Sequence, residues 1–544
     1  MTQAIAMPDN PGADCIIEAG TVLTGLNAGN VLTGLEAGTG LTGLGTDGKM
    51  TMRHDVGIRV EKGMIAQIGP MEAVGYGNDH LPRFGSRRMI AMPGLVNAHH
   101  HFGVTPLMQG VPFAPLELWL PQFRAMRRID QRLDTLYSAI EMLESGTTTV
   151  QHIHSGFSGT PDSWMQTAEA TISAYGEIGM RLGYCFMIRD RNILSYEPDA
   201  DILSRLPAKL RDWIAPQLAA ADIPVPRLME FYSDLRARFM KGSPQHIRMN
   251  LAPANLHWCS DDALQTIFET AKAAGGNVHM HLLETERQAE FARRTYGRSA
   301  VQHLQKLQCL DANVTLGHGN WMSGEDLDII ASCGCTICHN ASSGLRLGSG
   351  IAPVNEMRRR GIPVALGIDQ SNIADDRDMT LEMKLVWALH RETGLWNDRP
   401  DAGAVLQMAS EHGAASAGFG GFTGRLEPGW QADIVLMDKD RIARPAINSR
   451  TPPVEALLHR GGRHAIEQVF VGGRLVVDGG RVTTVDRDAV MAEIEAILSH
   501  PETDAERYAW QAVETLLPHL ESSLQQLGLG AGYRRYRYNS MSDQ

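Results

Sequence analysis

Short apolar segments that end in a histidine or an acidic residue recur along the middle of this chain. They carry the motifs N-A-H-H-H, H-L-L-E, L-G-H-G and A-L-G-I-D, which contribute His99, His101, His281, Glu284, His318 and Asp369. Each motif follows an apolar run that is typical of a buried strand. Side chains so far apart in sequence can share a site if parallel strands end at one common edge. The pattern therefore predicts parallel strands around a single site.

Eight segments in this region are expected to be strands. They are residues 89–99, 147–154, 181–188, 247–253, 277–283, 314–319, 335–340 and 364–369. Helical patterns separate them, for example residues 134–146 and 260–275, where Ser260 can cap the helix and glycines can end it. Such an alternation predicts the α/β class and a (β/α)8 TIM-like barrel, whose reactive groups lie at the carboxyl ends of the strands.

The two ends of the chain differ from this middle part and contain short strands with glycine turns. The predicted domains are residues 1–88 and 422–483 as two parts of one small β-sandwich, 89–421 as the barrel, and 484–544 as a helical C-terminal extension. A chain of 544 residues is too long for one ordinary core. Residues 22–48 form a Gly-rich nonapeptide repeat, and the basic, aromatic end at 533–544 is interpreted as a packing or subunit contact.

Composition excludes several classes of partner. A net charge of −12 argues against binding to nucleic acid or to anionic lipid. The sequence has neither an apolar stretch of 18 residues nor a signal-peptide pattern, so no membrane segment is expected. Seven cysteines favour a reducing cytoplasm. Cys333, Cys335 and Cys338 lack a fourth ligand at zinc-site spacing and are expected to be buried around a strand.

The strand-end histidines have the spacing of a metal site. His99 and His101 are two residues apart, so both can face the same side of one strand, whereas His100 faces the other side and is expected to be structural. His281 can supply a third nitrogen and Asp369 a carboxylate oxygen. Three histidines and one aspartate suit one divalent ion, with Zn²⁺ favoured and Fe²⁺ chemically plausible. The fourth strand has no lysine to bridge a second ion.

The same cluster contains groups that could move protons. Bound zinc can lower the pKa of water from 15.7 to about 7, which makes hydroxide available at neutral pH. Asp369 can accept the proton of the water, and Glu284 can pass a proton to the substrate. His318 can polarise the substrate or stabilise developing negative charge. The predicted catalytic residues are therefore Glu284, His318 and Asp369.

Several longer motifs extend this picture. MIAMPGLVNAHHHF, LELWL, EMLESGTTTV, HMHLLET, TLGHG, SGLRLGSGIAP, ALGID and LEPGWQADIVLMD together resemble the amidohydrolase superfamily, in the branch of cytosine, guanine and S-adenosylhomocysteine deaminases and triazine chlorohydrolases. The resemblance implies a distorted (β/α)8 barrel with a β-sandwich built from both termini. It also implies the ligand and proton-transfer roles given above, and a homodimer or higher oligomer.

Three departures from the family pattern concern the expected pocket. The loop at 340–344 reads N-A-S-S-G instead of N-P-x-S-N, the stretch after Asp369 reads Q-S-N-I-A-D-D, and His152 and His154 follow a strand where an acidic residue is common. These changes leave the predicted metal ligands in place, but they weaken any inference about the substrate from the family. The candidate substrate-binding residues are Trp119, His154, His257 and Gln370.

These observations predict a cytoplasmic, metal-dependent hydrolase of non-peptide C–N bonds. The favoured reaction is hydrolytic deamination of an amino-substituted purine, pterin, pyrimidine or triazine. Hydrolysis of an amide, urea or carbamate, or dechlorination, is the alternative on the same fold. A metal-free barrel that serves as a scaffold is a third hypothesis, which predicts the loss of at least one ligand.

Overall fold

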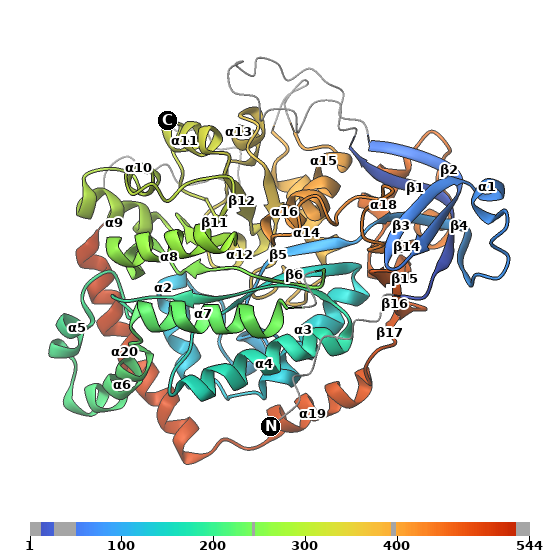
Figure 1. Ribbon diagram of the computed structural model, residues 1–544. Helices are drawn as coiled ribbons and strands as arrows, with labels where there is room; N and C mark the ends of the chain where they lie inside the picture. Colours follow the sequence, from blue (N-terminus) through green and yellow to red (C-terminus); the bar gives the residue numbers. More distant parts are fainter. Residues whose placement is uncertain (1–11, 27–49, 242–244, 393–398, 529–544) are drawn as a thin grey trace.

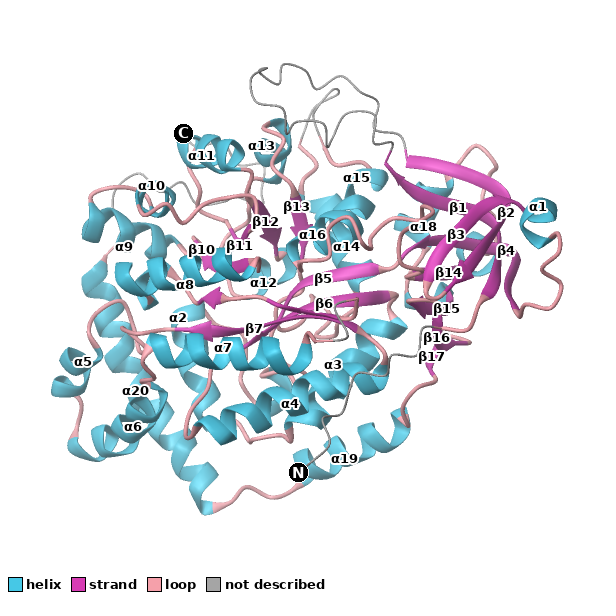
Figure 2. Cartoon of the chain, viewed as in Figure 1, coloured by secondary structure: helices cyan, strands magenta, loops and turns pink. Residues whose placement is uncertain are grey.

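The computed structural model describes residues 12–26, 50–241, 245–392 and 399–528 (Figure 1). Most of the repeat at 22–48 and all of the basic end at 533–544 lie outside these ranges. A barrel with surrounding helices occupies most of the molecule, and a β-rich domain lies at one side of it (Figure 2). Among the described residues, no helix combines the length and hydropathy needed to cross a membrane.

The β-rich domain combines strands from both ends of the chain in one sheet. Its order is β17-β16-β15-β14-β4-β1-β2-β3. The strands are β1 (Cys15–Leu26), β2 (Met50–Glu61), β3 (Met64–Pro70), β4 (Arg83–Pro93), β14 (Ile434–Asp438), β15 (Ile466–Val471), β16 (Arg474–Asp478) and β17 (Arg481–Val482). β4 joins the two halves, because it pairs with β1 on one side and with β14 on the other. This confirms the small β-sandwich domain built from both termini.

The barrel consists of two parallel sheets of four main strands each. The strands are β5 (Leu95–His100), β6 (Thr147–His154), β7 (Arg181–Ile188), β8 (Ile247–Met249), β9 (Ala252–Pro253), β10 (Val278–Leu282), β11 (Val314–His318), β12 (Thr336–His339) and β13 (Val364–Leu366). The sheets meet through two single pairings, His100 with Asp369 and Leu251 with Val278. The fold is therefore a distorted (β/α)8 barrel, as predicted.

One expected strand, residues 89–99, is wrong as a single element. Residues up to Pro93 belong to β4 of the sandwich sheet, and the barrel begins at Leu95 in β5 instead of at residue 89. The chain passes from one sheet to the other at Gly94, where an added Cβ would lie 2.1 Å from Thr148 Oγ1. The expected strand at 247–253 is also divided, into β8 and β9.

Helices surround the barrel and connect its strands. Those of the barrel are α3 (Gln131–Glu144), α4 (Pro161–Ile178), α7 (Val225–Phe239), α8 (Asp261–Ala274), α9 (Glu286–Tyr296), α10 (Ala300–Lys306), α11 (Gly324–Cys333), α12 (Ala341–Arg346), α13 (Val354–Arg359), α14 (Met379–Leu389), α15 (Ala402–Gln407) and α16 (Gly413–Ser416). Shorter helices of the sandwich are α1 (Met71–Gly75), α17 (Lys439–Ala443) and α18 (Pro453–Arg460). The caps predicted for α8 are present: Ser260 accepts from the Ala263 N–H, and Gly275 has a φ of 61°.

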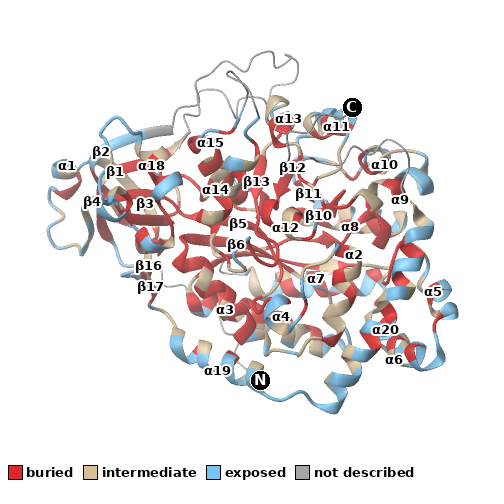
Figure 3. Ribbon diagram, turned by 180° about the vertical axis from the view of Figure 1, so that it is seen from behind, coloured by how far each residue is buried: buried red, intermediate tan, exposed pale blue. Residues whose placement is uncertain are grey.

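Further helices lie outside this repeating pattern. They are α2 (Leu116–Trp119) with the 3₁₀ turn η2 (Leu120–Ala125), α5 (Asp199–Arg205), α6 (Ala208–Ala221), α19 (Arg487–Ser499) and α20 (Asp504–Leu527). Figure 3 shows that buried residues concentrate in the barrel and that α19 and α6 are largely exposed. All seven cysteines are free; Cys335 and Cys338 are buried and Cys333 is partly exposed.

Candidate active site

The six strand-end residues predicted from the sequence meet at the carboxyl ends of the barrel strands. His99 and His101 come from the end of β5, His281 from β10 and His318 from the last position of β11. Asp369 follows β13. His318 and Asp369 have φ values of 71° and 67°, a left-handed conformation that is rare for non-glycine residues and occurs preferentially at functional sites.

Neighbouring ligand atoms among four of these side chains are spaced as in a tetrahedral metal site. Nε2 of His101 lies 3.2 Å from Nε2 of His99 and 3.2 Å from Nε2 of His281. Oδ1 of Asp369 lies 3.3 Å from Nε2 of His101 and 3.6 Å from Nε2 of His99. Zinc bonds of about 2.0 Å in a tetrahedron separate the ligand atoms by about 3.3 Å. The buried donor set therefore fits a divalent ion.

Neighbouring groups orient these potential ligands. Nδ1 of His99 lies 2.8 Å from Nε2 of His279, and Nδ1 of His101 lies 2.9 Å from the Ile153 carbonyl oxygen. Such contacts at the second ring nitrogen fix the tautomer and the plane of a metal-binding imidazole. His100 does not join the cluster and packs against His152 instead, with 5.6 Å between the ring centroids.

The carboxylate of Asp369 is held by a residue of the short helix α12 that was not among the candidate site residues. The Ser343 hydroxyl donates to Oδ2 of Asp369 at 2.6 Å, which leaves Oδ1 facing the histidines. Burial acts to raise the pKa of Asp369, but the contact and charge of the His101 imidazole outweigh it, so this pKa lies below its usual range. Asp369 is therefore held as the anion that a metal ligand requires.

Glu284 and His318 lie beside this donor set. Oε2 of Glu284 is 3.7 Å from Nε2 of His318, and both residues have a ligand atom within 4.8 Å of Asp369. Burial, reinforced by the charge of Asp369, raises the pKa of Glu284 well above its usual value. Burial also lowers the pKa of His318 to about 4, so its imidazole is neutral at pH 7. A carboxyl whose pKa is raised and a neutral imidazole suit proton transfer and substrate polarisation.

A cavity of about 650 Å³ opens above the cluster, with His101, His281, Glu284, His318 and Asp369 on its surface. The rest of it is bounded mainly by residues 116–128, which contain α2 and η2, and residues 193–221, which contain α5 and α6. These two segments are termed the cavity walls below. Because neither is a barrel strand, the strand pattern of the sequence gave no information about them.

The four candidate substrate-binding residues divide into two groups. His257 and Gln370 line the cavity. The structure does not place Trp119 or His154 on its surface. Trp119 is fully buried behind the wall, where it packs edge-on against Phe123 at 4.7 Å. His154 stacks at 4.7 Å on Phe157, and Phe157 lies between it and the cavity.

Three arginines, which the sequence analysis did not identify, also line the cavity. They are Arg124, Arg128 and Arg189. Arg189 lies 5.4 Å from the ring of Trp258, and burial, together with the charge of Arg124, lowers its pKa to about 10, so it stays cationic at pH 7. Within the described part of the chain, none of the three forms an ion pair with a carboxylate. The surface of the cavity therefore combines the acidic, histidine-rich cluster with three cationic side chains.

Comparisons with known proteins agree with this architecture. Residues 90–476 match the model of the Amidohydrolase family. The 5-methylthioadenosine/S-adenosylhomocysteine deaminase of Acetivibrio thermocellus is 28% identical over 415 residues, which cover 75% of this chain and 86% of that protein.

Two crystal structures have the same fold. A zinc-bound adenosine deaminase from Xanthomonas campestris has a TM-score of 0.68 at 23% identity, covering 90% of this chain and 98% of that one. A zinc complex of the atrazine chlorohydrolase from Arthrobacter aurescens has a TM-score of 0.73 at 21% identity, covering 89% and 100%.

Proposed function

Because this chain belongs to the amidohydrolase family, we propose that it is a metal-dependent hydrolase that removes the amino group of an amino-substituted heterocycle. The observation that carries the proposal is the short spacing of three imidazoles and one carboxylate at the barrel mouth, with a glutamate of raised pKa beside them. A scaffold without metal would have no need to retain all four donors. The curated relative that deaminates adenosine-derived compounds supports the same reaction.

His99, His101, His281 and Asp369 would hold one divalent ion. Zinc is favoured because both structural neighbours contain it and because the donor set is rich in nitrogen; Fe²⁺ is the alternative. When bound, such an ion makes hydroxide available near neutral pH. The ligand roles rest on the ligand-to-ligand distances described above.

The remaining steps belong to side chains of this chain. Asp369 can accept a proton from the attacking water, because it is held as the anion beside the donor set and Ser343 fixes its orientation. Glu284 is suited to deliver a proton to a ring nitrogen, and the proton that Asp369 takes from the water can then pass through Glu284 to the departing amine. His318, neutral and buried beside Glu284, can polarise the substrate.

The cavity gives a finer expectation for the substrate. A volume of about 650 Å³ exceeds what a bare heterocycle fills, so the substrate is expected to carry a substituent that extends along the walls. Arg124, Arg128 and Arg189 favour a negatively charged group on that substituent. An adenosine-type nucleoside with an acidic side chain meets both requirements.

The decisive experiment is a panel of amino-purines, nucleosides, pterins, pyrimidines and triazines assayed for release of ammonia. Substituting Glu284 by Gln should retain the metal and lower kcat by about 10²–10⁴-fold. Substituting His281 by Ala should lower metal content, measured by elemental analysis, whereas His459→Ala on the surface should not. Release of chloride or an acyl product without ammonia would favour the alternative hydrolysis, and a chain purified with less than about 0.2 ion would favour the scaffold.

Assembly and location form part of the same proposal. Seven free thiols fit a reducing cytoplasm. A homodimer or a higher oligomer is expected by family analogy. Light scattering of the purified protein measures the assembly, and a monomeric mass would contradict that expectation.

A further inference from the structure

The cavity walls contact barrel residues, for example through Tyr196 on His257 and Phe123 on Phe102, and they also pack against the C-terminal helix. An apolar cluster joins Leu194, Ile202, Leu206, Leu210, Ile214 and Leu218 of one wall to α20 residues Ala512, Leu516 and Leu520. It is separate from the main core, and within the described residues it includes no residue of a barrel strand. Figure 1 shows α20, in red, running beside α5 and α6.

Polar contacts attach both walls to the same extension. Arg127 of the first wall donates from Nε to Oε1 of Glu506 at 2.7 Å and from Nη1 to the His500 carbonyl oxygen at 2.9 Å. In the second wall, the hydroxyl of Ser195 lies 3.4 Å from that of Ser523 in α20. Ser195 itself lines the substrate cavity, so this contact joins α20 directly to the cavity surface.

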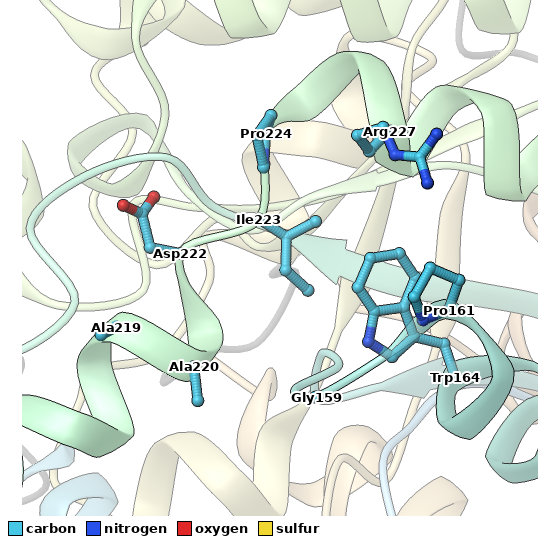
Figure 4. Close-up of a pocket in the computed structure, with 9 residues that line it drawn as sticks. All are labelled: Gly159, Pro161, Trp164, Ala219, Ala220, Asp222, Ile223, Pro224 and Arg227. Carbon is cyan, nitrogen blue, oxygen red and sulfur yellow. The ribbon is translucent and has the colours of Figure 1, made fainter.

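The second wall is also hollow on its other face. A cavity of about 330 Å³ lies behind it, bounded by Trp164, Ile223 and the C-terminal end of α6. Figure 4 shows Ala219 and Ala220 on one side of this space and Trp164 on the other. Ala220 lines both cavities, so the end of α6 borders open volume on two sides.

We infer that α20 positions the cavity walls and thereby sets the selectivity of the enzyme for the substituent of its substrate. This inference depends on the proposed function only for the kind of substrate, because the mechanical coupling follows from the packing alone. The reacting ring meets the barrel floor, whose residues are fixed by parallel strands. The substituent meets walls whose position depends on a helix near the end of the chain.

Leu516→Ala tests the coupling, since Leu516 is fully buried in the shared cluster. Glu514→Ala, an exposed position on the same helix, is the matched control. Hydrogen–deuterium exchange should accelerate in residues 193–221 of the Leu516 variant and remain unchanged in β5, β10 and β11. Equal exchange in the walls of both variants would overturn the inference, and this readout requires neither substrate nor metal.

Kinetics then test selectivity with two substrates that share one heterocycle, one bare and one carrying an acidic substituent. In Leu516→Ala the KM of the substituted compound should rise about tenfold while kcat and the KM of the bare compound change less than about twofold. An equal rise in KM for both compounds would overturn the proposed role of α20 in selectivity. No turnover of either compound by the parent enzyme would instead count against the proposed function, and exchange would still decide the coupling.

Arg127→Gln provides a second variant that leaves the apolar cluster intact. It should accelerate exchange in residues 116–128 and raise the same KM, with metal content unchanged. Arg132→Gln, which removes an exposed pair with Glu177, is its control. If Arg127→Gln behaved like Arg132→Gln in both exchange and KM, α20 would not position the first wall.

Discussion

The ion pair between Arg181 and Asp433 provides a stringent test of how the two domains are joined. Arg181 begins the barrel strand β7, and Asp433 precedes the sandwich strand β14; both side chains are 0% exposed. Asp433 accepts from Nε and Nη2 of Arg181 at 2.9 and 2.8 Å, and from Thr423 Oγ1 and the Gly472 N–H at 2.7 Å each. The perturbation is Arg181→Leu.

The expected cost follows from what the substitution leaves behind. Asp433 would keep two neutral donors but lose two charge-assisted hydrogen bonds in a site without solvent. Removing one partner of a buried pair destabilises a protein by about 3–5 kcal/mol, mainly because the other charge remains buried and uncompensated. With an unfolding entropy of about 2.1 cal/mol/K per residue, the midpoint of thermal unfolding should fall by about 3–4 °C if the chain unfolds as one unit.

The contribution of Asp433 to stability should change with pH in opposite directions in the parent protein and in the Arg181→Leu variant. In the parent, Arg181 and its hydrogen bonds outweigh burial and lower the pKa of Asp433, so its contribution is present above the unfolded pKa and is lost as pH falls through the folded pKa. Without Arg181, burial should raise that pKa above its unfolded value. The variant should therefore recover part of its deficit as pH falls from 8 to 5.

Thermal unfolding at pH 8 and pH 5 measures both effects. Arg132→Leu, which breaks a half-exposed pair with Glu177, should lower the midpoint by less than about 1 °C and serves as the control. The double variant Arg181→Leu with Asp433→Asn should recover part of the loss at pH 8. An Arg181→Leu midpoint within 1 °C of the parent at pH 8 would refute the reasoning, as would a deficit that does not depend on pH.

Three further outcomes concern the metal-site residues. Ser343→Ala removes the donor to Asp369 and should lower kcat about tenfold while metal content stays constant; unchanged kcat would show that Asp369 keeps its orientation without it. His279→Phe removes the contact to Nδ1 of His99 and should weaken metal affinity about 10–100-fold in a competition assay with a chelator, and parent-like affinity would contradict an orienting role. Exhaustive chelation should abolish activity and lower the unfolding midpoint, both restored by added Zn²⁺ or Fe²⁺; full activity without metal would exclude the proposed chemistry.

The barrel strands were predictable because each is an apolar run bounded by turn residues. The predicted ranges for β6 and β7 agree with the structure at both ends. Prediction was wrong at residues 89–99, where one continuous apolar run serves two sheets and changes direction at Gly94. Periodicity reports burial but does not distinguish which sheet buries a residue, so the domain boundary was placed before β4 ended.

The metal-site residues were predictable for a related reason. A strand end fixes the direction of its side chains, so the spacing of His99 and His101 carries geometric information. Ser343 lies in the short helix α12, whose position depends on tertiary packing, so its contact with Asp369 could not be predicted from the spacing of residues along a strand. The position of Trp119 also depends on tertiary packing. It lies in a wall segment, but its side chain packs into the interior, and Phe123 lines the cavity instead.

The chemistry and the choice of substrate thus depend on different parts of the chain. The proposed metal ligands and proton carriers lie on or next to parallel strands, whose positions are set by backbone hydrogen bonds on both sides. The walls depend on side-chain packing with α20, almost 400 residues beyond α2 in the sequence. Substitutions in α20 can therefore change the cavity without displacing a ligand. For the same reason, relatives at 28% identity support the reaction more strongly than they support any particular substrate.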